Sequence, residues 1–355
     1  MIRDFIIVGR GLAATCLMHR FKQQGISFIT IGNPQLSLSS KVAAGIYNPV
    51  VFKRLTSSWM ANQLIPSLLK FYKYCEETLN EKLIFERQLL KPFTEEQEKK
   101  HWQKKSRAEL GPFLDETLYD ATEQHHHFKI KNQFGIVKNA GNLNIAKFIQ
   151  SSDLFFEEHI IDDIIDYQQI KSTEEIISYK SFQAKNIIFC EGYLVKHNPF
   201  FNWIPLVPAK GEILTIQCDE LKLKDFIFNR DGFILDLGNN YYKVGATYEW
   251  GDLNDLSTQD GLKSLKKKID LMIDADYKIV SHEAGVRPSS KDRRPIIGPH
   301  PKRSNCYIFN GLGAKGVMLS PFFSENFVHF YLQKEKLHRE VDIKRFYDLY
   351  EPSTY

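Results

Sequence analysis

Paired cysteines are missing from this 355-residue sequence. Its five cysteines are scattered, with no CxxC pair and no histidine at metal-ligand spacing. Disulfide scaffolds and structural zinc modules depend on such clusters. We therefore expect neither a disulfide framework nor a structural zinc site.

Long apolar runs and a large charge of one sign are missing as well. No run approaches the roughly 18 apolar residues that cross a bilayer as a helix. Lys and Arg number 47 against 43 Asp and Glu, so the formal net charge is only +4. That balance does not argue for nucleic-acid binding without a localised basic groove. The composition predicts a soluble protein with no membrane span.

The composition predicts a packed hydrophobic core. Hydrophobic residues make up 43% and charged residues 25%, close to the average of globular proteins and far from that of disordered chains. At about 150 residues per domain, the length predicts two domains, or one large α/β unit with an insert.

The N-terminal residues imitate the start of a signal peptide. Arg3 is followed by an apolar run to Val8, but the run is too short for a signal and ends in Gly9-Arg10-Gly11. Residues 5–8 instead have the β-branched and aromatic pattern of a buried parallel strand. We interpret them as the first strand of a cytoplasmic protein.

A βαβ unit is predicted at the start of the chain. Residues 12–24 carry apolar side chains at helical spacing, and residues 27–31 indicate a second strand. Between the first strand and the helix, residues 9–14 (GRGLAA) match G-x-G-x-x-A. A match in this setting indicates a dinucleotide site, the alternative being a purely structural glycine-rich turn.

Each small residue of this fingerprint has a physical task. Gly9 permits the tight turn, Gly11 lets the backbone approach a pyrophosphate, and Ala14 allows close packing of helix on strand. The helix N-terminus then offers N–H groups to the phosphates. An acidic residue that would bind the ribose is expected about 20 residues on, yet Gly32 and Asn33 stand there. We expect Asn33 to contact the ribose and the cofactor to bind less tightly.

Further elements are predicted from periodicity and turn residues. The predicted helices cover residues 59–80, 95–109, 262–272 and 322–332, the second of them charged and solvated, the third Lys-rich with a solvated face. The predicted strands cover residues 128–131, 135–137, 155–161, 164–167, 176–179, 186–190, 211–216, 226–236, 241–247 and 307–309. Asn239-Asn240 indicates a hairpin turn.

Five further segments, which recur along most of the chain, support a family resemblance. They are SSKVAAGIYNP (39–49), PLVPAKGE (205–212), VGATYE (244–249), GVRP (285–288) and GLGAKG (311–316). In order and spacing, and together with the N-terminal fingerprint, they resemble the D-amino-acid oxidase family of FAD-dependent amine oxidoreductases. Residues 45–49 and 311–316 are locally similar to the FAD domain of a bifunctional enzyme that processes a modified uridine in tRNA. Residues from about 51 to 135 match no pattern of the family.

The resemblance implies an α/β (α+β) fold with a glutathione-reductase-type, Rossmann-like FAD domain and an inserted, mixed and largely antiparallel substrate domain. The FAD-binding domain would comprise residues 1–50, 140–200 and 281–355. The substrate-binding domain would comprise residues 51–139 and 201–280.

The resemblance also implies a set of cofactor contacts. They are Gly9, Gly11, Leu12, Ala13, Ala14, Asn33, Ser40, Ala43, Ala44, Gly45, Gly192, Gly313, Lys315, Gly316, Val317 and Met318. Sarcosine oxidase attaches its flavin covalently at the position of Gly285, where this sequence has no Cys or His. Non-covalent FAD is therefore expected.

Three candidate catalytic residues follow from the same resemblance. Arg287 would hold a substrate carboxylate in two parallel hydrogen bonds, the alternative being an ion pair with Asp292. Lys243 would activate oxygen beside flavin N5, or be a plain strand lysine. Lys315 would add positive charge at the flavin pyrimidine, or be an exposed loop lysine.

The implied activity is oxidation of a C–N bond in a small amine or amino acid, by hydride transfer to flavin N5. One alternative is a flavin-dependent enzyme acting on a carboxymethylaminomethyl-modified tRNA nucleoside, with a basic surface at Lys99, Lys100, Lys104, Lys105 and Arg107. Another is a non-catalytic dinucleotide-binding protein on the same fold. No metal is expected, because the three histidines at 125–127 cannot converge on one ion from a strand, and we expect them in an exposed loop. The sequence does not indicate an oligomeric state.

Overall fold

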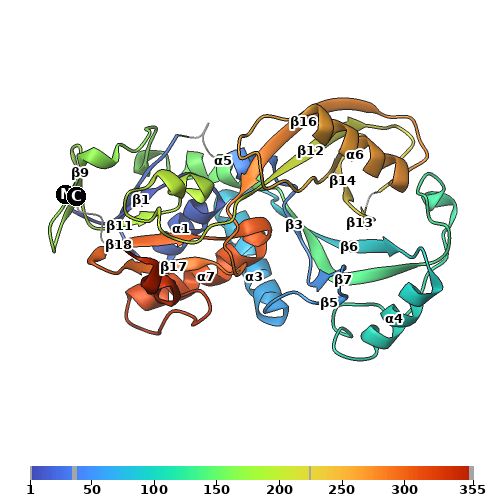
Figure 1. The fold of residues 1–355 in the computed structure, drawn as a ribbon, viewed down its shortest axis with the longest axis horizontal. Coiled ribbons are helices and arrows are strands. Elements are labelled where there is room, and N and C mark those ends of the chain that lie inside the picture. The colour runs from blue at the N-terminus through green and yellow to red at the C-terminus, as the bar shows by residue number, and fades with distance from the viewer. Residues whose placement is uncertain (1, 34–37, 224, 352–355) are drawn as a thin grey trace.

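The computed structural model describes residues 2–33, 38–223 and 225–351. Within them, two eight-stranded sheets lie side by side along the long axis of the molecule, and a two-stranded sheet completes the set (Figure 1). Among the residues described, no helix is both long enough and apolar enough to cross a bilayer.

The first sheet has a parallel centre. Its strands follow the order β17 (Ile296–His300), β18 (Arg303–Asn310), β11 (Phe182–Phe189), β1 (Arg3–Val8), β2 (Phe28–Ile31) and β8 (Ile160–Ile161), with β10 (Ile177–Tyr179) and β9 (Ile170–Ser172) attached to β11. Strands β18, β11, β1, β2 and β8 run parallel. Strands β17, β10 and β9 pair antiparallel with their neighbours.

The second sheet is largely antiparallel. Its order is β16 (Lys278–Arg287), β12 (Ala209–Gln217), β15 (Tyr241–Gly245), β14 (Phe233–Gly238), β13 (Phe226–Asn229), β6 (Ile84–Pro92), β7 (Phe134–Leu143) and β3 (Ile46–Tyr47). Only the β13 and β6 pair is parallel among these strands. Strands β4 (Val50–Val51) and β5 (Thr56–Ser57) form the small sheet.

Helices and short 3₁₀ turns link these strands. The α-helices are α1 (Leu12–Gln23), α2 (Leu38–Val42), α3 (Ala61–Leu79), α4 (Glu96–Ser106), α5 (Ile145–Phe155), α6 (Gln259–Met272) and α7 (Gly316–Tyr331). The 3₁₀ turns are η2 (Glu123–His125), η3 (Glu157–His159), η4 (Tyr167–Gln169), η5 (Gly192–His197), η6 (Gly313–Lys315) and η7 (Ile343–Leu349).

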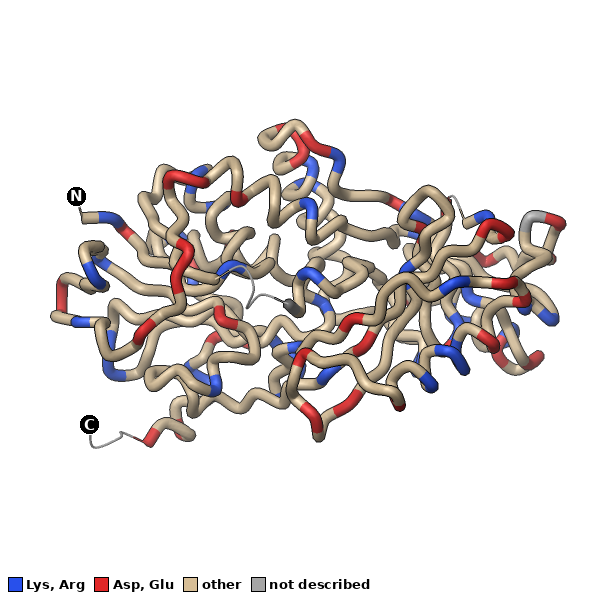
Figure 2. Tube along the Cα trace, turned by 90° about the horizontal axis from the view of Figure 1, so that it is seen from above, with Lys and Arg blue, Asp and Glu red and all other residues tan. Residues whose placement is uncertain are grey.

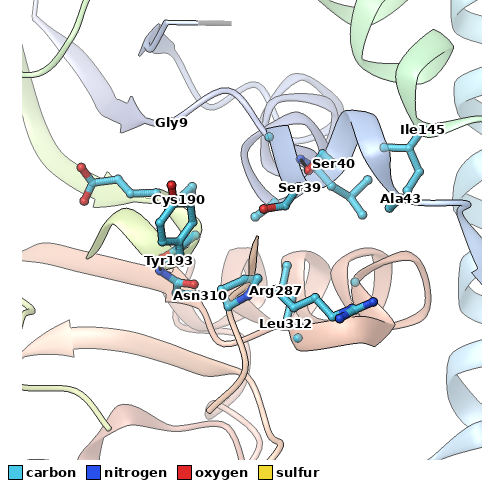
Figure 3. Close-up of a pocket in the computed structure, with 18 of the residues that line it drawn as sticks. Gly9, Ser39, Ser40, Ala43, Ile145, Cys190, Tyr193, Arg287, Asn310 and Leu312 are labelled. Carbon is cyan, nitrogen blue, oxygen red and sulfur yellow. Dashed lines mark hydrogen bonds between the residues drawn. The ribbon is translucent and has the colours of Figure 1, made fainter. Parts of the chain in front are cut away.

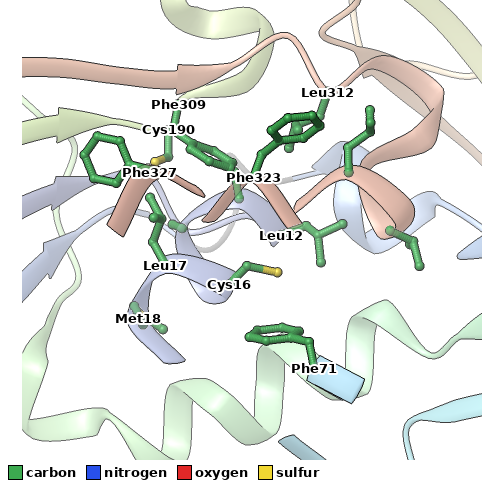
Figure 4. Close-up of a cluster of buried hydrophobic side chains, with 14 of the residues drawn as sticks. Leu12, Cys16, Leu17, Met18, Phe71, Cys190, Phe309, Leu312, Phe323 and Phe327 are labelled. Carbon is green, nitrogen blue, oxygen red and sulfur yellow. The ribbon is translucent and has the colours of Figure 1, made fainter. Parts of the chain in front are cut away.

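The first strand shows why a continuous apolar run is needed in the parallel sheet. Phe5 and Ile7 belong to the core beneath α1, α3 and α7, whereas Ile6 and Val8 belong to a second core on the other face. Successive side chains of a strand point to opposite faces, so all four are buried. Figure 4 shows part of the first core, where α1 and α7 bring Leu17, Phe323 and Phe327 together.

The structure confirms the predicted fold class and much of the element order. The βαβ unit forms, and β11, which contains residues 186–189, lies beside β1 in the parallel sheet. Asn239 and Asn240 adopt positive φ angles of 53° and 62° between β14 and β15, which suits a two-residue hairpin turn. Strand β7 crosses position 140 and β16 crosses position 281. The division into domains stays a prediction.

Four strand predictions are wrong. Residues 226–236 form not one strand but parts of two, β13 and β14, which pair antiparallel across a turn. Residues 128–131 form only an isolated bridge from Phe128 to Ile273. Residues 155–161 contain the end of α5 and the turn η3, and only their last two residues form a strand, β8. Residues 164–167 are not a strand. At 155–161 the apolar side chains that suggested a strand pack from a helix end, as Phe156 does against His19, whereas Ile164 is 59% exposed.

Candidate active site

A cavity of about 580 Å³ lies where the two sheets meet. Its wall combines the turn after β1, helix α2, the segments after β8 and β11, the near end of the second sheet and the loop before α7. Figure 3 shows Gly9, Ser40, Arg287 and Asn310 around this space, although they come from distant parts of the chain.

The turn at Gly9 opens the cavity floor. Gly9 has a φ of 115°, and a Cβ there would lie 2.5 Å from the carbonyl oxygen of Cys190 on the neighbouring strand. Only glycine fits such a position. Gly11 then precedes helix α1 in extended conformation without a side-chain cap, and the amide of Leu12 donates to Ser40 Oγ at 3.2 Å. The N-terminus of α1 is thus available to an anionic group.

Most of the predicted cofactor contacts line this one cavity. They are Gly9, Gly11, Leu12, Ala13, Asn33, Ser40, Ala43, Ala44, Gly45, Gly192, Gly313, Gly316 and Val317, together with Arg287. Ala14 and Met318 do not line it and are buried in the core below. Lys243 and Lys315 do not line it either.

The two lysines reach protein atoms instead. Lys243 Nζ donates to the carbonyl of Val42 at 2.9 Å, and burial lowers the pKa of Lys243. Lys315 Nζ donates to Ser58 Oγ at 2.7 Å. Burial, and to a lesser extent nearby Arg294, lowers the pKa of Lys315 to about 8. Their catalytic roles stay predictions.

Arg287 stands at the end of β16 with its side chain laid across β12. Its Nη1 donates to the carbonyl of Lys210 at 3.2 Å and its Nη2 to the carbonyl of Thr247 at 3.3 Å. A Cβ on Gly211 would lie 2.0 Å from Nη2, so glycine is what allows the guanidinium to cross. Burial lowers the pKa of Arg287. A guanidinium has more N–H donors than two carbonyls use.

No carboxylate in the described part of the chain pairs with Arg287. Asp292, the alternative partner, binds Arg345 Nε at 2.9 Å and the backbone amide of Arg294 at 3.0 Å. The guanidinium of Arg287 lies 5.0 Å from the ring centroid of Tyr248. The site therefore holds a partly buried cation without an anion of its own.

Tyr248 lies against Arg287 without lining the cavity itself, and the sequence analysis did not select it. It follows Thr247 directly, is 43% exposed, and its ring lies 4.7 Å from that of Trp250, which is 59% exposed. The loop is fixed behind them, because Glu249 exchanges two backbone hydrogen bonds with Lys210. The sequence signal was present, since Tyr248 lies within the segment 244–249 that carries the resemblance.

At the end of the cavity away from Arg287, the wall contains Arg10, which forms ion pairs with two acids. Arg10 Nε lies 3.0 Å from Asp153 Oδ2, and Nη1 contacts Asp162 Oδ1. The wall continues through Gly32 and through residues 163–165. Residues 164 and 165 were predicted as part of a strand, 164–167, and residue 163 was not selected, so their place in the site was missed.

Glu191 is a buried acid in the same part of the wall. Its carboxylate accepts hydrogen bonds from Tyr167 at 2.5 Å and from Asn198 at 2.6 Å. Burial raises the pKa of Glu191 to about 7 despite these two donors. No sequence signal distinguished this residue from other strand-end acids.

The structure offers no metal centre among the residues it describes, since no group of His, Cys, Asp and Glu there could hold an ion. The expectation of an exposed histidine loop is wrong for His125, which is 5% exposed and packs against Phe134 and Phe226. All five cysteines are free and buried. The glycine turn, the uncapped helix and the elongated wall suit a dinucleotide.

Comparison with known proteins agrees with this geometry. The model of the DAO family, described as FAD dependent oxidoreductase, matches residues 4–328. Glycine oxidase of Bacillus subtilis is 32% identical over 144 residues, which are 39% of this chain and 38% of that protein.

A longer match joins the chain to the tRNA 5-methylaminomethyl-2-thiouridine biosynthesis bifunctional protein MnmC of Legionella pneumophila. It is 27% identical over 327 residues, which are 84% of this chain and 46% of that protein. The chain thus spans less than half the length of these curated relatives. Among solved structures, glycine oxidase of Geobacillus kaustophilus superposes with a TM-score of 0.78 at 17% identity, covering 96% of this chain and 99% of the other.

Proposed function

Because the chain belongs to the DAO family of FAD-dependent oxidoreductases, we propose that it oxidises the C–N bond of a small amine or amino acid that carries a carboxylate. The observation that carries this proposal is Arg287, a partly buried cation in the cavity wall that is held by two backbone carbonyls and by no carboxylate of the described residues. Burying a charge without a counter-ion costs free energy, which a ligand that supplies the anion would offset.

The residues of the cavity fit FAD, and their tasks can be divided. The N-terminus of α1, with Gly9 and Gly11, would take the pyrophosphate. Bound FAD supplies the acceptor for the two electrons that leave the substrate as a hydride. Arg287 would orient the substrate through its carboxylate, so that the reacting carbon is held in one position.

Non-covalent binding of FAD is part of the proposal. A Cβ on Gly285 would lie 3.0 Å from the Cα of Ser39, so a larger residue at this position would push against helix α2. Acid precipitation should release the flavin into solution. Flavin that stays with the precipitate would contradict this part of the proposal, and the absence of bound flavin after incubation with FAD would favour the non-catalytic alternative.

The test of the function is the anaerobic reduction of bound flavin by a carboxylate-bearing amine such as sarcosine. Arg287→Ala should slow this reduction by about 10²-fold or more, because breaking a buried bidentate charge pair on one side costs about 3–5 kcal/mol. Arg287→Lys should recover part of the rate, since a point charge lacks the planar fork. Arg303→Ala, at an exposed position on β18, serves as the matched control.

An amine without a carboxylate separates binding from chemistry. Its reaction should be indifferent to Arg287→Ala. If its rate falls as far as that of sarcosine, Arg287 organises the site rather than the substrate, and the proposal loses its support.

A second candidate is a carboxymethylaminomethyl-modified nucleoside in tRNA. It is favoured by the MnmC match over 84% of the chain and by the exposed Tyr248 and Trp250 rings beside Arg287, since aromatic rings stack on bases. The predicted basic surface on α4 does not support it, because Lys99 pairs with Glu96 and Lys105 with Glu109. Figure 2 shows basic and acidic residues interspersed along the trace.

Flavin reduction by an RNA oligonucleotide bearing this group, compared with sarcosine, distinguishes the two candidates. A nucleoside enzyme should react faster with the oligonucleotide and lose that preference in Tyr248→Ala. A small-amine enzyme should favour sarcosine.

A further inference from the structure

The end of β2 lacks the acid that dinucleotide folds use to bind the ribose. Gly32 stands there and lines the cavity. A Cβ at Gly32 would lie 3.0 Å from the Cβ of Arg10 and 3.1 Å from the carbonyl carbon of Gly9. A side chain at this position would be tightly packed against Arg10 and the glycine turn, which would have to shift by a few tenths of an ångström.

The neighbouring strand offers a carboxylate at the same level. Strand β8 runs parallel to β2 with Ile161 opposite Ile31, and the amide of Gly32 donates to the carbonyl of Ile161 at 3.1 Å. Adjacent strands lie about 4.8 Å apart. The residue after Ile161, Asp162, therefore leaves the sheet at the edge where Gly32 leaves it.

Arg10 holds Asp162 at the rim of the cavity, whose lining includes Arg10 and the next residue, Asp163, but not Asp162 itself. Arg10 is the middle residue of the G-x-G turn, lines the cavity and contacts Asp162 through Nη1. Its side chain is 11% exposed, whereas that of Asp162 is 72% exposed. A carboxylate has several acceptor positions and Arg10 uses one oxygen, so Asp162 keeps acceptors for a ligand.

The two neighbouring acids are committed to protein groups. Asp153 faces Arg10 from α5 with its side chain only 15% exposed. Asp163 lines the cavity, but its Oδ2 accepts from Lys180 at 2.6 Å and from Tyr179 at 3.1 Å. Among these three acids, Asp162 is the accessible one.

We propose that Asp162, held by Arg10, accepts a hydrogen bond from the 2′-hydroxyl of the adenosine ribose of FAD. In this chain the ribose-binding carboxylate is then displaced by one strand, from the end of β2 to the end of β8. The pairing of Asp162 with Arg10 fixes the carboxylate in place before FAD arrives, and an ionised acceptor makes a stronger hydrogen bond to a hydroxyl than the amide of an asparagine does.

The test measures the affinity of the apoprotein for FAD by quenching of flavin fluorescence. Asp162→Asn should weaken FAD binding by about tenfold or more, the size of one charge-assisted hydrogen bond. Glu158→Gln is the matched control, since it removes an exposed acid from the preceding turn η3, and it should leave the affinity unchanged. Thermal melting of the apoproteins checks that each variant is folded.

Two further probes make the test specific for the ribose. FAD with a 2′-deoxy adenosine should bind wild type about tenfold more weakly than FAD, and should bind Asp162→Ala, which has no side-chain acceptor, as well as FAD does. FMN, which lacks the adenosine half, should bind both proteins equally. The inference is overturned if the 2′-deoxy penalty is the same in both proteins, which would assign the ribose to another residue. It is also overturned if FMN binding falls with FAD binding, which would indicate a general effect on charge or fold.

Discussion

The two ends of the cavity each contain an arginine, and the two arginines are satisfied in different ways. At the end proposed for the nucleotide (the nucleotide end), Arg10 contacts the carboxylates of Asp153 and Asp162. At the end proposed for the substrate (the substrate end), Arg287 has two backbone carbonyls and the ring of Tyr248. A guanidinium that is ion-paired with protein acids has a structural role in a site. One with only neutral partners can form an ion pair with an anionic ligand.

The nucleotide end also contains the opposite case, an acid that pairs with no cation of the described residues. Glu191 is held by Tyr167 and Asn198, both neutral. An uncompensated cation and an uncompensated acid thus lie in different parts of one cavity wall. Separating their effects experimentally is the way to test whether the two ends act independently.

The largest expected effect comes from closing the nucleotide end. Gly11→Val places a branched side chain where the pyrophosphate would approach the backbone, so the purified protein should retain no FAD. The visible absorption spectrum measures this directly. Retention of flavin by a folded Gly11→Val protein would contradict the assignment of the pyrophosphate to the turn before α1.

Glu191, at the same end, should make the free energy of unfolding depend on pH. Burial raises the pKa of Glu191 from 4.5 to about 7. Between these values the unfolded chain has lost the proton that the folded protein keeps, so the free energy of unfolding falls as pH rises from about 4.5 to 7. The total loss is about 3 kcal/mol.

Glu191→Gln removes the titrating group and should flatten that part of the pH profile. Urea unfolding of the apoprotein at several pH values between 5 and 8, at one low salt concentration, compares the two proteins. Identical slopes in wild type and variant would show that Glu191 does not titrate in this range.

The substrate end should respond to the glycine beneath Arg287. Gly211→Ala puts a methyl group within 2.0 Å of the present position of Nη2, so the guanidinium must move. We expect kcat/KM for sarcosine to fall by about tenfold while FAD affinity is unchanged. Gly251→Ala, where a Cβ meets nothing within 4 Å, is the control. A parallel loss of FAD affinity would mean that the two ends are coupled.

The smallest effect is expected from the acid that was the alternative partner of Arg287. Asp292→Asn should cost about 1 kcal/mol or less, because its partly exposed pair with Arg345 contributes little. Steady-state kinetics should show no change in kcat/KM. A large kinetic loss would show that Asp292 does influence Arg287, and Arg287 would then resemble Arg10 in depending on a protein acid.

Local signals were sufficient for the parts of the fold that depend on neighbouring residues. The strand at 5–8, the glycine turn and the Asn239–Asn240 hairpin were predicted because their patterns reflect burial on both faces or a positive φ angle. Strand prediction failed at 155–161 because Phe155 and Phe156 end a helix that packs on His19. Helix α5 itself was missed, although Ile145, Phe148, Ile149 and Ser152 are buried at helical spacing.

The candidate site was predictable in the same uneven way. The glycine-rich turns were identified because each turn itself forms the cavity surface. The pairing of Arg10 with Asp162 was not, because the partners are 152 residues apart and meet only after β8 has joined β2. The surroundings of Arg287 likewise depend on Lys210 from β12 and on Thr247 from the segment after β15. The sequence therefore indicated that Arg287 belongs to the site but not which groups contact it.

The parallel sheet has a consequence for folding during synthesis. Strand β1 pairs with β2 on one side, but its other edge waits for β11, where Phe5 meets Asn186, and β11 waits in turn for β18, where Ile188 meets Tyr307. Pairings between such distant residues form slowly. All strands of the second sheet are translated before β18 emerges from the ribosome. The cavity can therefore close around the cofactor only late in synthesis, with the edge of β11 that later pairs with β18 exposed to chaperones until then.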